Sequence, residues 1–167
     1  MKKFLYLNIS LAILLLIIFS VSKSLSPSEN HNISDTDVNF TFDLPQPDPT
    51  LRPHEVVEMQ VLALRENDKP FKNFGVMTTF NFASPEYKSK NGPEAKFIKM
   101  IHNPEYNSLI GFKMYGLDDI YVVKNMALQK VTLIDAEDNP VVYLFKLTRQ
   151  TEEPYIGCWM IDSVMKF

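Results

Sequence analysis

The chain has 167 residues, of which 46% are hydrophobic and 22% are charged. This composition is typical of a globular protein and leaves room for one ordinary domain. The net charge of −3 disfavours nucleic acid as a partner. The single cysteine, Cys158, excludes an intramolecular disulfide and any multi-cysteine metal site, and we expect no metal and no cofactor.

The N-terminus has a pattern typical of export. Lys2 and Lys3 precede an apolar run at residues 4–21 that carries no charge. Its length lies between that of a cleaved signal peptide and that of a membrane-spanning anchor. We therefore expect residues 1–22 to be a signal peptide or a signal anchor. Both alternatives place the rest of the chain outside the cytoplasm, either held at the membrane by residues 4–21 or released as a secreted, periplasmic or luminal protein.

A polar segment rich in Ser, Asn, Asp and Pro follows at residues 23–52. Alternating prolines near its end favour extended backbone, so we interpret the segment as a disordered linker. Asn32 and Asn39 begin glycosylation sequons, which matter only in a eukaryotic secretory pathway.

Helical signals come first in the remaining domain, residues 53–167. Pro53 fits the first position of a helix whose apolar residues recur at Val57, Val61 and Leu64. A short second helix is predicted around residues 71–77, although Gly75 weakens it. A third is predicted to start at Pro93 and to end before residues 103–104.

From residue 109 the hydrophobic period changes to two, which is typical of strands. We predict strands at Leu109–Met114, Ile120–Lys124, Leu128–Ile134, residues 141–147 and Tyr155–Val164. Helices followed by an antiparallel meander predict an α+β fold and disfavour a parallel sheet.

Several segments of the domain resemble a domain-of-unknown-function family of small exported or plastid proteins. The segment from Glu55 to Phe82-Ala83-Ser84-Pro85 resembles the opening of that family, with Asn67-Asp68 at its polar pair. Phe97-Ile98-Lys99-Met100-Ile101 with Tyr106 is similar to its central segment. Residues 157–164 are similar to its closing strand, in which Ser163 replaces a glycine. The resemblance implies helices packed on a curved antiparallel sheet of four to five strands, a cone of the nuclear-transport-factor-two or cystatin-like kind. It implies no activity.

Candidate chemistry is sparse. Asp162 lies in an apolar strand, where burial inside a cone would suit it as a general base. Tyr121 and Tyr143 could then donate to an oxyanion, and Trp159 and Tyr143 could line a binding pocket. The more ordinary interpretation of all three aromatic residues is core packing.

A pairing of Cys158 as nucleophile with His102 is a weaker hypothesis, because no motif surrounds either residue. We therefore expect a non-catalytic binding or assembly module, which could form a homodimer through its sheet or take an unknown small ligand or protein. The alternative is a small-molecule hydrolase or isomerase that uses Asp162 as base. A cystatin-type protease inhibitor ranks last, because the glycine-bearing inhibitory loop is missing.

Overall fold

The computed structural model describes residues 43–167. The expected signal or anchor at residues 1–22, most of the expected linker, and Asn32 and Asn39 lie outside the described residues. Within the described part, no helix is both long and apolar enough to cross a membrane.

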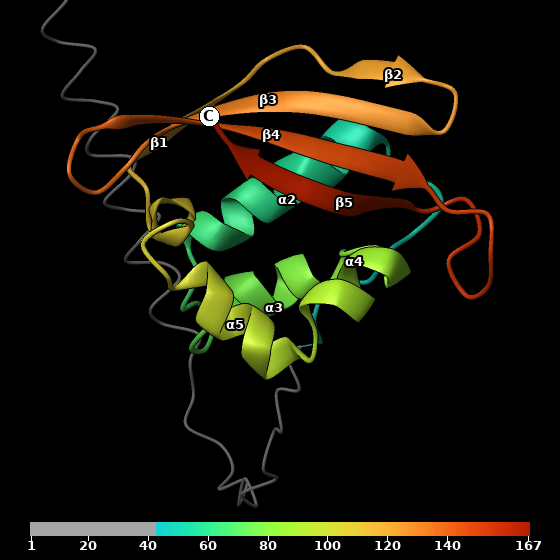
Figure 1. The fold of residues 1–167 in the computed structure, drawn as a ribbon, viewed down its shortest axis with the longest axis horizontal. Coiled ribbons are helices and arrows are strands. Elements are labelled where there is room, and N and C mark those ends of the chain that lie inside the picture. The colour runs from blue at the N-terminus through green and yellow to red at the C-terminus, as the bar shows by residue number, and fades with distance from the viewer. Residues whose placement is uncertain (1–42) are drawn as a thin grey trace, which may run out of the picture. The chain divides into compact units, whose positions relative to one another are not determined.

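Four helices of this part pack with a five-stranded antiparallel sheet, which confirms the predicted α+β fold (Figure 1). The elements, in chain order, are α2 (Pro53–Arg65), α3 (Phe74–Asn81), α4 (Pro85–Asn91), α5 (Glu94–Ile101), the 3-10 helix η1 (Asn107–Leu109), β1 (Met114–Leu117), β2 (Tyr121–Val123), β3 (Met126–Ile134), β4 (Pro140–Arg149) and β5 (Trp159–Lys166).

The strand order is β1-β3-β4-β5, and β2 pairs with β3 beside β1. Figure 1 shows all the helices on one side of the sheet, with α2 nearest to it. The sheet therefore has an inner face toward the helices and an outer face away from them.

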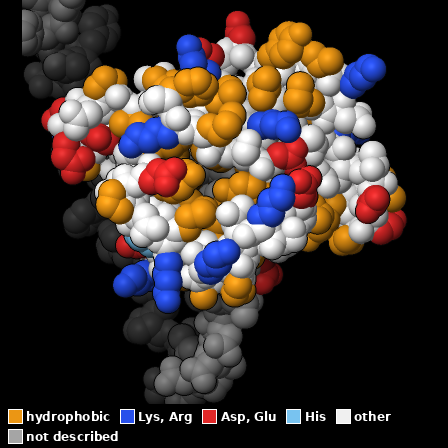
Figure 2. Space-filling view, in the orientation of Figure 1, with side chains coloured by type: hydrophobic (Ala, Val, Ile, Leu, Met, Phe, Trp, Pro, Cys, Tyr) orange, Lys and Arg blue, Asp and Glu red, His pale blue; other side chains and the backbone are white. Residues whose placement is uncertain are grey.

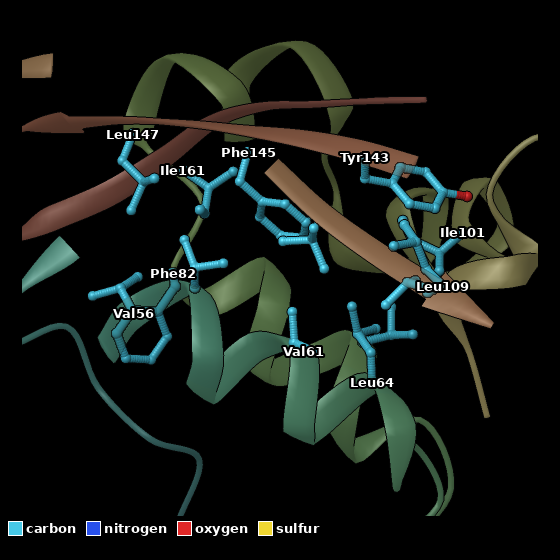
Figure 3. Close-up of a cluster of buried hydrophobic side chains, with 14 of the residues drawn as sticks. Val56, Val61, Leu64, Phe82, Ile101, Leu109, Tyr143, Phe145, Leu147 and Ile161 are labelled. Carbon is cyan, nitrogen blue, oxygen red and sulfur yellow. The ribbon is translucent and has the colours of Figure 1, made fainter. Parts of the chain in front are cut away.

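The core forms between α2 and the inner face. The predicted stripe of α2 is buried, with Val57 and Leu64 at its ends. In β4 every second side chain from Val141 to Leu147 is buried, as the period of two predicts. Figure 3 shows Phe145 and Ile161 of the sheet above Val61 of α2.

The predicted strand at Leu109–Met114 is wrong. Residues 107–109 form η1 instead, and Gly111 has a φ of 63°, a left-handed conformation that interrupts an extended strand. Strand β1 begins only at Met114.

Other elements also differ from the predictions. The second helix, predicted around residues 71–77, runs from Phe74 to Asn81. Helix α4 was not predicted, because no side chain of Pro85–Asn91 is buried and the segment has no apolar stripe. The last strand begins at Trp159 and not at Tyr155, since residues 151–157 form a turn-rich loop between β4 and β5.

Residues 43–52, which overlap the expected linker, contact the domain. Asn81 Nδ2 donates a hydrogen bond to the carbonyl oxygen of Pro45 at 2.6 Å. Leu51 packs against the core. Arg52 is the N-cap residue of α2 and bonds to Glu55 in its first turn.

Candidate functional site

Asp162 lies at an irregularity in β5. Lys146 of β4 pairs with Ser163, whereas Leu147 pairs with Ile161, so Asp162 is an extra residue without a partner across the strands. Thr148 Oγ1 donates a hydrogen bond to Asp162 Oδ1 at 3.0 Å. Since Leu147 faces the core, its neighbour Thr148 faces outward, and Asp162 lies on the outer side with it.

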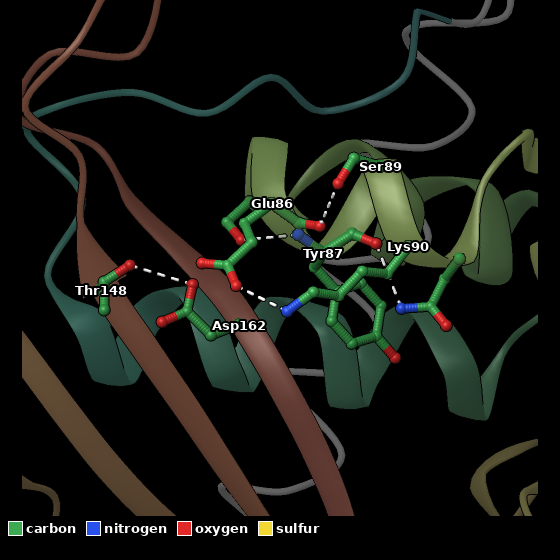
Figure 4. A network of polar contacts seen from close by, with 8 residues as sticks. Glu86, Tyr87, Ser89, Lys90, Thr148 and Asp162 are labelled. Atoms are coloured by element: carbon green, nitrogen blue, oxygen red, sulfur yellow. Dashed lines mark hydrogen bonds and ion pairs between the residues drawn. The ribbon is translucent and has the colours of Figure 1, made fainter.

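A polar hollow of about 180 Å³ lies beside Asp162, between α4 and the edge strand β5 (Figure 4). The hollow exists because the segment before α4 pairs with β5 at one point only. Ser84 N donates to the carbonyl oxygen of Ile161 at 2.8 Å, and Pro85 then starts α4 away from the strand.

The charges around this hollow balance. Lys90 Nζ lies 2.6 Å from Glu86 Oε1, and this hydrogen bond together with the lysine charge lowers the pKa of Glu86. Lys146 and Asp162 supply the second cation and the second anion. Asp162 thus borders a polar hollow open to solvent, and it is not among the residues that line the apolar interior.

The interior itself is filled. A narrow apolar groove between the helices and the inner face contains roughly 400 Å³ of space, part of it open to solvent, but only about 10 Å³ is wide enough for the centre of a water molecule. This is room for one water at most. The groove is lined by Leu64, Thr79, Ala83, Tyr87, Phe97, Ile101, Tyr106, Leu109, Phe145, Ile161 and Val164.

Tyr121 and Tyr143 lie on opposite faces of the sheet. Tyr121 pairs with Leu128, which faces outward, and its side chain is 64% exposed. Tyr143 is buried on the inner face, where its hydroxyl lies 2.7 Å from Ser108 Oγ. Burial raises the pKa of Tyr143 above its usual value, so the hydroxyl stays protonated at neutral pH. The structure therefore does not bring these two hydroxyls together.

Trp159 packs in the core on the inner face of β5. Cys158 is also buried, and burial raises the pKa of its thiol. His102 Nε2 lies 2.8 Å from Asn73 Oδ1, and no contact in the described part joins His102 to Cys158. Among residues 43–167, no three His, Cys, Asp or Glu side chains gather in a way that could hold a metal ion.

The outer face of the sheet is unusually apolar. A solvent-facing antiparallel sheet normally carries polar side chains on its open face. Here the register places hydrophobic side chains on most outward positions, and Figure 2 shows hydrophobic side chains gathered over the upper part of the molecule. They are Met114, Tyr121, Val123, Met126, Leu128, Ile134, Val142, Leu144 and Met165. The alternation in the sequence could have identified this face, because both sets of alternating positions in β3 and β4 are rich in hydrophobic residues.

A family model described as a domain of unknown function (DUF4864) matches residues 48–166, and the chain belongs to this family. No curated protein and no solved structure matches the chain.

Proposed function

We propose that this member of the DUF4864 family is a non-catalytic assembly module that pairs with a second copy of itself through the outer face of its sheet. The observation that carries the proposal is the row of apolar side chains on that face. Contiguous exposed apolar surface of this kind marks an interaction site. Met114 and Met165 are respectively 63% and 46% exposed, so the monomer leaves them in contact with water.

A second copy suits this face because the face carries little net charge. Lys130, at its centre, forms an ion pair with Asp118 at 2.7 Å. A two-fold interface brings the same patch from each partner together, so a strongly charged patch would repel its own copy. A nearly neutral apolar patch avoids that repulsion.

The proposal places the module outside the cytoplasm, because residues 4–21 have the pattern of an export signal or anchor. We further propose that the domain is similar to nuclear-transport-factor-two-like proteins, because its helices pack on one face of an antiparallel sheet. We do not extend the proposal to a hydrolase or isomerase, because Asp162 borders an open polar hollow and the interior is filled.

Cysteine cross-linking in cells that produce the full-length chain tests the pairing. Leu144 lies near the middle of the outer face, between Lys130 and Met165. The native Cys158 is buried, so L144C supplies the accessible thiol. We expect a short bis-maleimide to link L144C into a covalent dimer. The control S89C places a thiol on the exposed surface of α4, on the helical side, and we expect it to stay monomeric.

A charge at the same position provides the second measurement. We expect Leu144→Asp to dissociate the purified dimer in analytical ultracentrifugation, because pairing would bury an unpaired carboxylate. A full-length chain that sediments as a monomer, or an L144C adduct made only with a different protein, would contradict pairing with a second copy.

A further inference from the structure

Three polar side chains meet at the end of the core, on the inner face of the sheet. Tyr143 OH lies 2.7 Å from Ser108 Oγ, and Lys166 Nζ lies 3.5 Å from the same oxygen. The three residues are far apart in sequence and come from β4, the 3-10 helix η1 and the end of β5. Figure 3 shows the hydroxyl of Tyr143 pointing away from Phe145, past Ile101 and Leu109, toward this end.

This cluster holds more hydrogen-bond donors than acceptors. One hydroxyl donates to the other, and Lys166 donates to Ser108, so the O–H of either Ser108 or Tyr143 is left over. No other described group accepts a hydrogen bond from these three side chains. Tyr143 is fully buried and can donate to Ser108, so the spare O–H is that of Ser108, which is partly exposed and free to donate to a ligand.

The charge at the cluster fits an anion of single charge. Lys166 is exposed and forms no ion pair with any described carboxylate, so its ammonium group remains available. The carboxylate of Glu105 lies near enough to influence Tyr143, and it opposes a second negative charge on a ligand. Asp135 acts on Tyr143 in the same way, because hydrogen bonds from the backbone of Asn139 and Glu137 lower the pKa of Asp135 and keep its carboxylate ionised.

An apolar surface adjoins the three donors. Val164 precedes Lys166 by two residues on the same face of β5 and lines the apolar groove. Leu109 follows Ser108 directly and lines the groove as well, and Tyr106 lies half-buried beside them. The inner groove is too narrow for more than a water, so an apolar group would rest against its outer part.

We propose that Lys166, Ser108 and Tyr143 form a binding site for a monocarboxylate that carries a short apolar chain. The carboxylate oxygens accept hydrogen bonds from the ammonium group and the spare hydroxyl, and the chain lies against Tyr106 and Val164. The site lies on the inner side of the sheet, so it does not depend on pairing through the outer face. A chain that fails to dimerise can still bind the ligand, and a chain that fails to bind the ligand can still dimerise.

An NMR titration of the full-length chain with hexanoate tests the site, with ¹³C-labelled tyrosine rings as reporters. We expect the resonances of Tyr143 and Tyr106 to shift and to saturate. Hexanamide has the same chain without the charge, and we expect it to bind about tenfold more weakly or worse. Inorganic phosphate is the third probe, and we expect it to bind more weakly than hexanoate because of Glu105.

Charge variants locate the carboxylate. We expect Lys166→Met to weaken hexanoate binding about tenfold or more, whereas Lys130→Met removes a lysine from the outer face and leaves binding unchanged. Glu105→Gln is expected to strengthen binding. Lys166 is exposed at a strand end, so we expect the variant to fold, and its thermal unfolding curve provides the check.

Four outcomes would overturn the proposal. The first is that hexanoate leaves the rings of Tyr143 and Tyr106 unshifted. The second is equal binding of hexanoate and hexanamide, and the third is equal loss in the Lys166 and Lys130 variants. Tighter binding of phosphate than of hexanoate would assign the site to a phosphate group and contradict the carboxylate.

Discussion

Gly75 marks the closest approach of two helices. Its backbone N–H donates to the carbonyl oxygen of Asn67 at 2.9 Å, where α3 crosses the end of α2. A Cβ at this position would overlap the backbone carbonyl of Ala63, which cannot move without shifting α2. We expect Gly75→Ala to lower the free energy of unfolding by about 2 kcal/mol or more, as overpacking does, and urea denaturation measures the loss.

Gly116 provides the matched control for this substitution. A Cβ at Gly116, in the exposed strand β1, meets no atom within 4 Å. We expect Gly116→Ala to change the free energy of unfolding by no more than about 0.5 kcal/mol. Equal losses at the two glycines would show that the helix contact is not the cause.

At the scale of single elements, the start of α2 depends on one ionised carboxylate. Glu55 accepts hydrogen bonds from the side chain and the backbone N–H of Arg52, which lower the pKa of Glu55 to about 2 from a usual 4.5. A lowered folded-state pKa contributes stability above pH 4.5 that disappears as the pH falls toward 2.

We therefore expect Glu55→Gln to destabilise the protein at neutral pH, and the difference from the native chain to shrink as the pH falls from about 5 to 2. Thermal unfolding across this pH range measures the difference. Glu58, on the same helix, has no ion pair among the described residues, so Glu58→Gln is the control. A difference for Glu55→Gln that stays constant with pH would contradict the role of its charge.

The sequence predicts those elements whose side chains have one clear periodicity. Helix α2 and strand β4 fall in this class, since one face of each is buried. Helix α4 has no fully buried side chain, although Tyr87 packs half-buried against Phe97, and the start of the helix is fixed by its cap, where Ser84 Oγ accepts a hydrogen bond from Tyr87 N at 3.2 Å. Such an element depends on local hydrogen bonds and leaves no hydrophobic pattern.

At the scale of the whole molecule, the candidate sites depend on contacts that no local pattern contains. Tyr143 is a candidate pocket residue in the sequence because it is aromatic, but its hydrogen-bond partner Ser108 lies 35 positions away along the chain. Asp162 was considered as a base buried inside a cone, but it lies on the outer side of the sheet beside Thr148, at an irregularity of β5 that no local pattern contains. Only the folded sheet defines these neighbours.

The extent of the folded unit leads to a further prediction. Residues 43–52 contribute the bond from Asn81 to Pro45 and the packing of Leu51, and Pro49 lies against Gly157 in the loop before β5. The family match also begins before Pro53, at residue 48. We expect a chain that starts at residue 53 to unfold with a free energy about 2 kcal/mol lower than one that starts at residue 43, because it loses apolar burial and a hydrogen bond.

Urea denaturation of the two shortened chains measures this difference. Asn81→Ala in the chain that starts at residue 43 then separates the contribution of the hydrogen bond from the other contributions. That variant removes only the bond to Pro45, so we expect it to lose about 1 kcal/mol, less than the full truncation. The remainder then belongs to Leu51 and to the capping of α2 by Arg52. Identical unfolding curves for the two shortened chains would place the start of the folded unit at Pro53, and the contacts of residues 43–52 would then contribute nothing to stability.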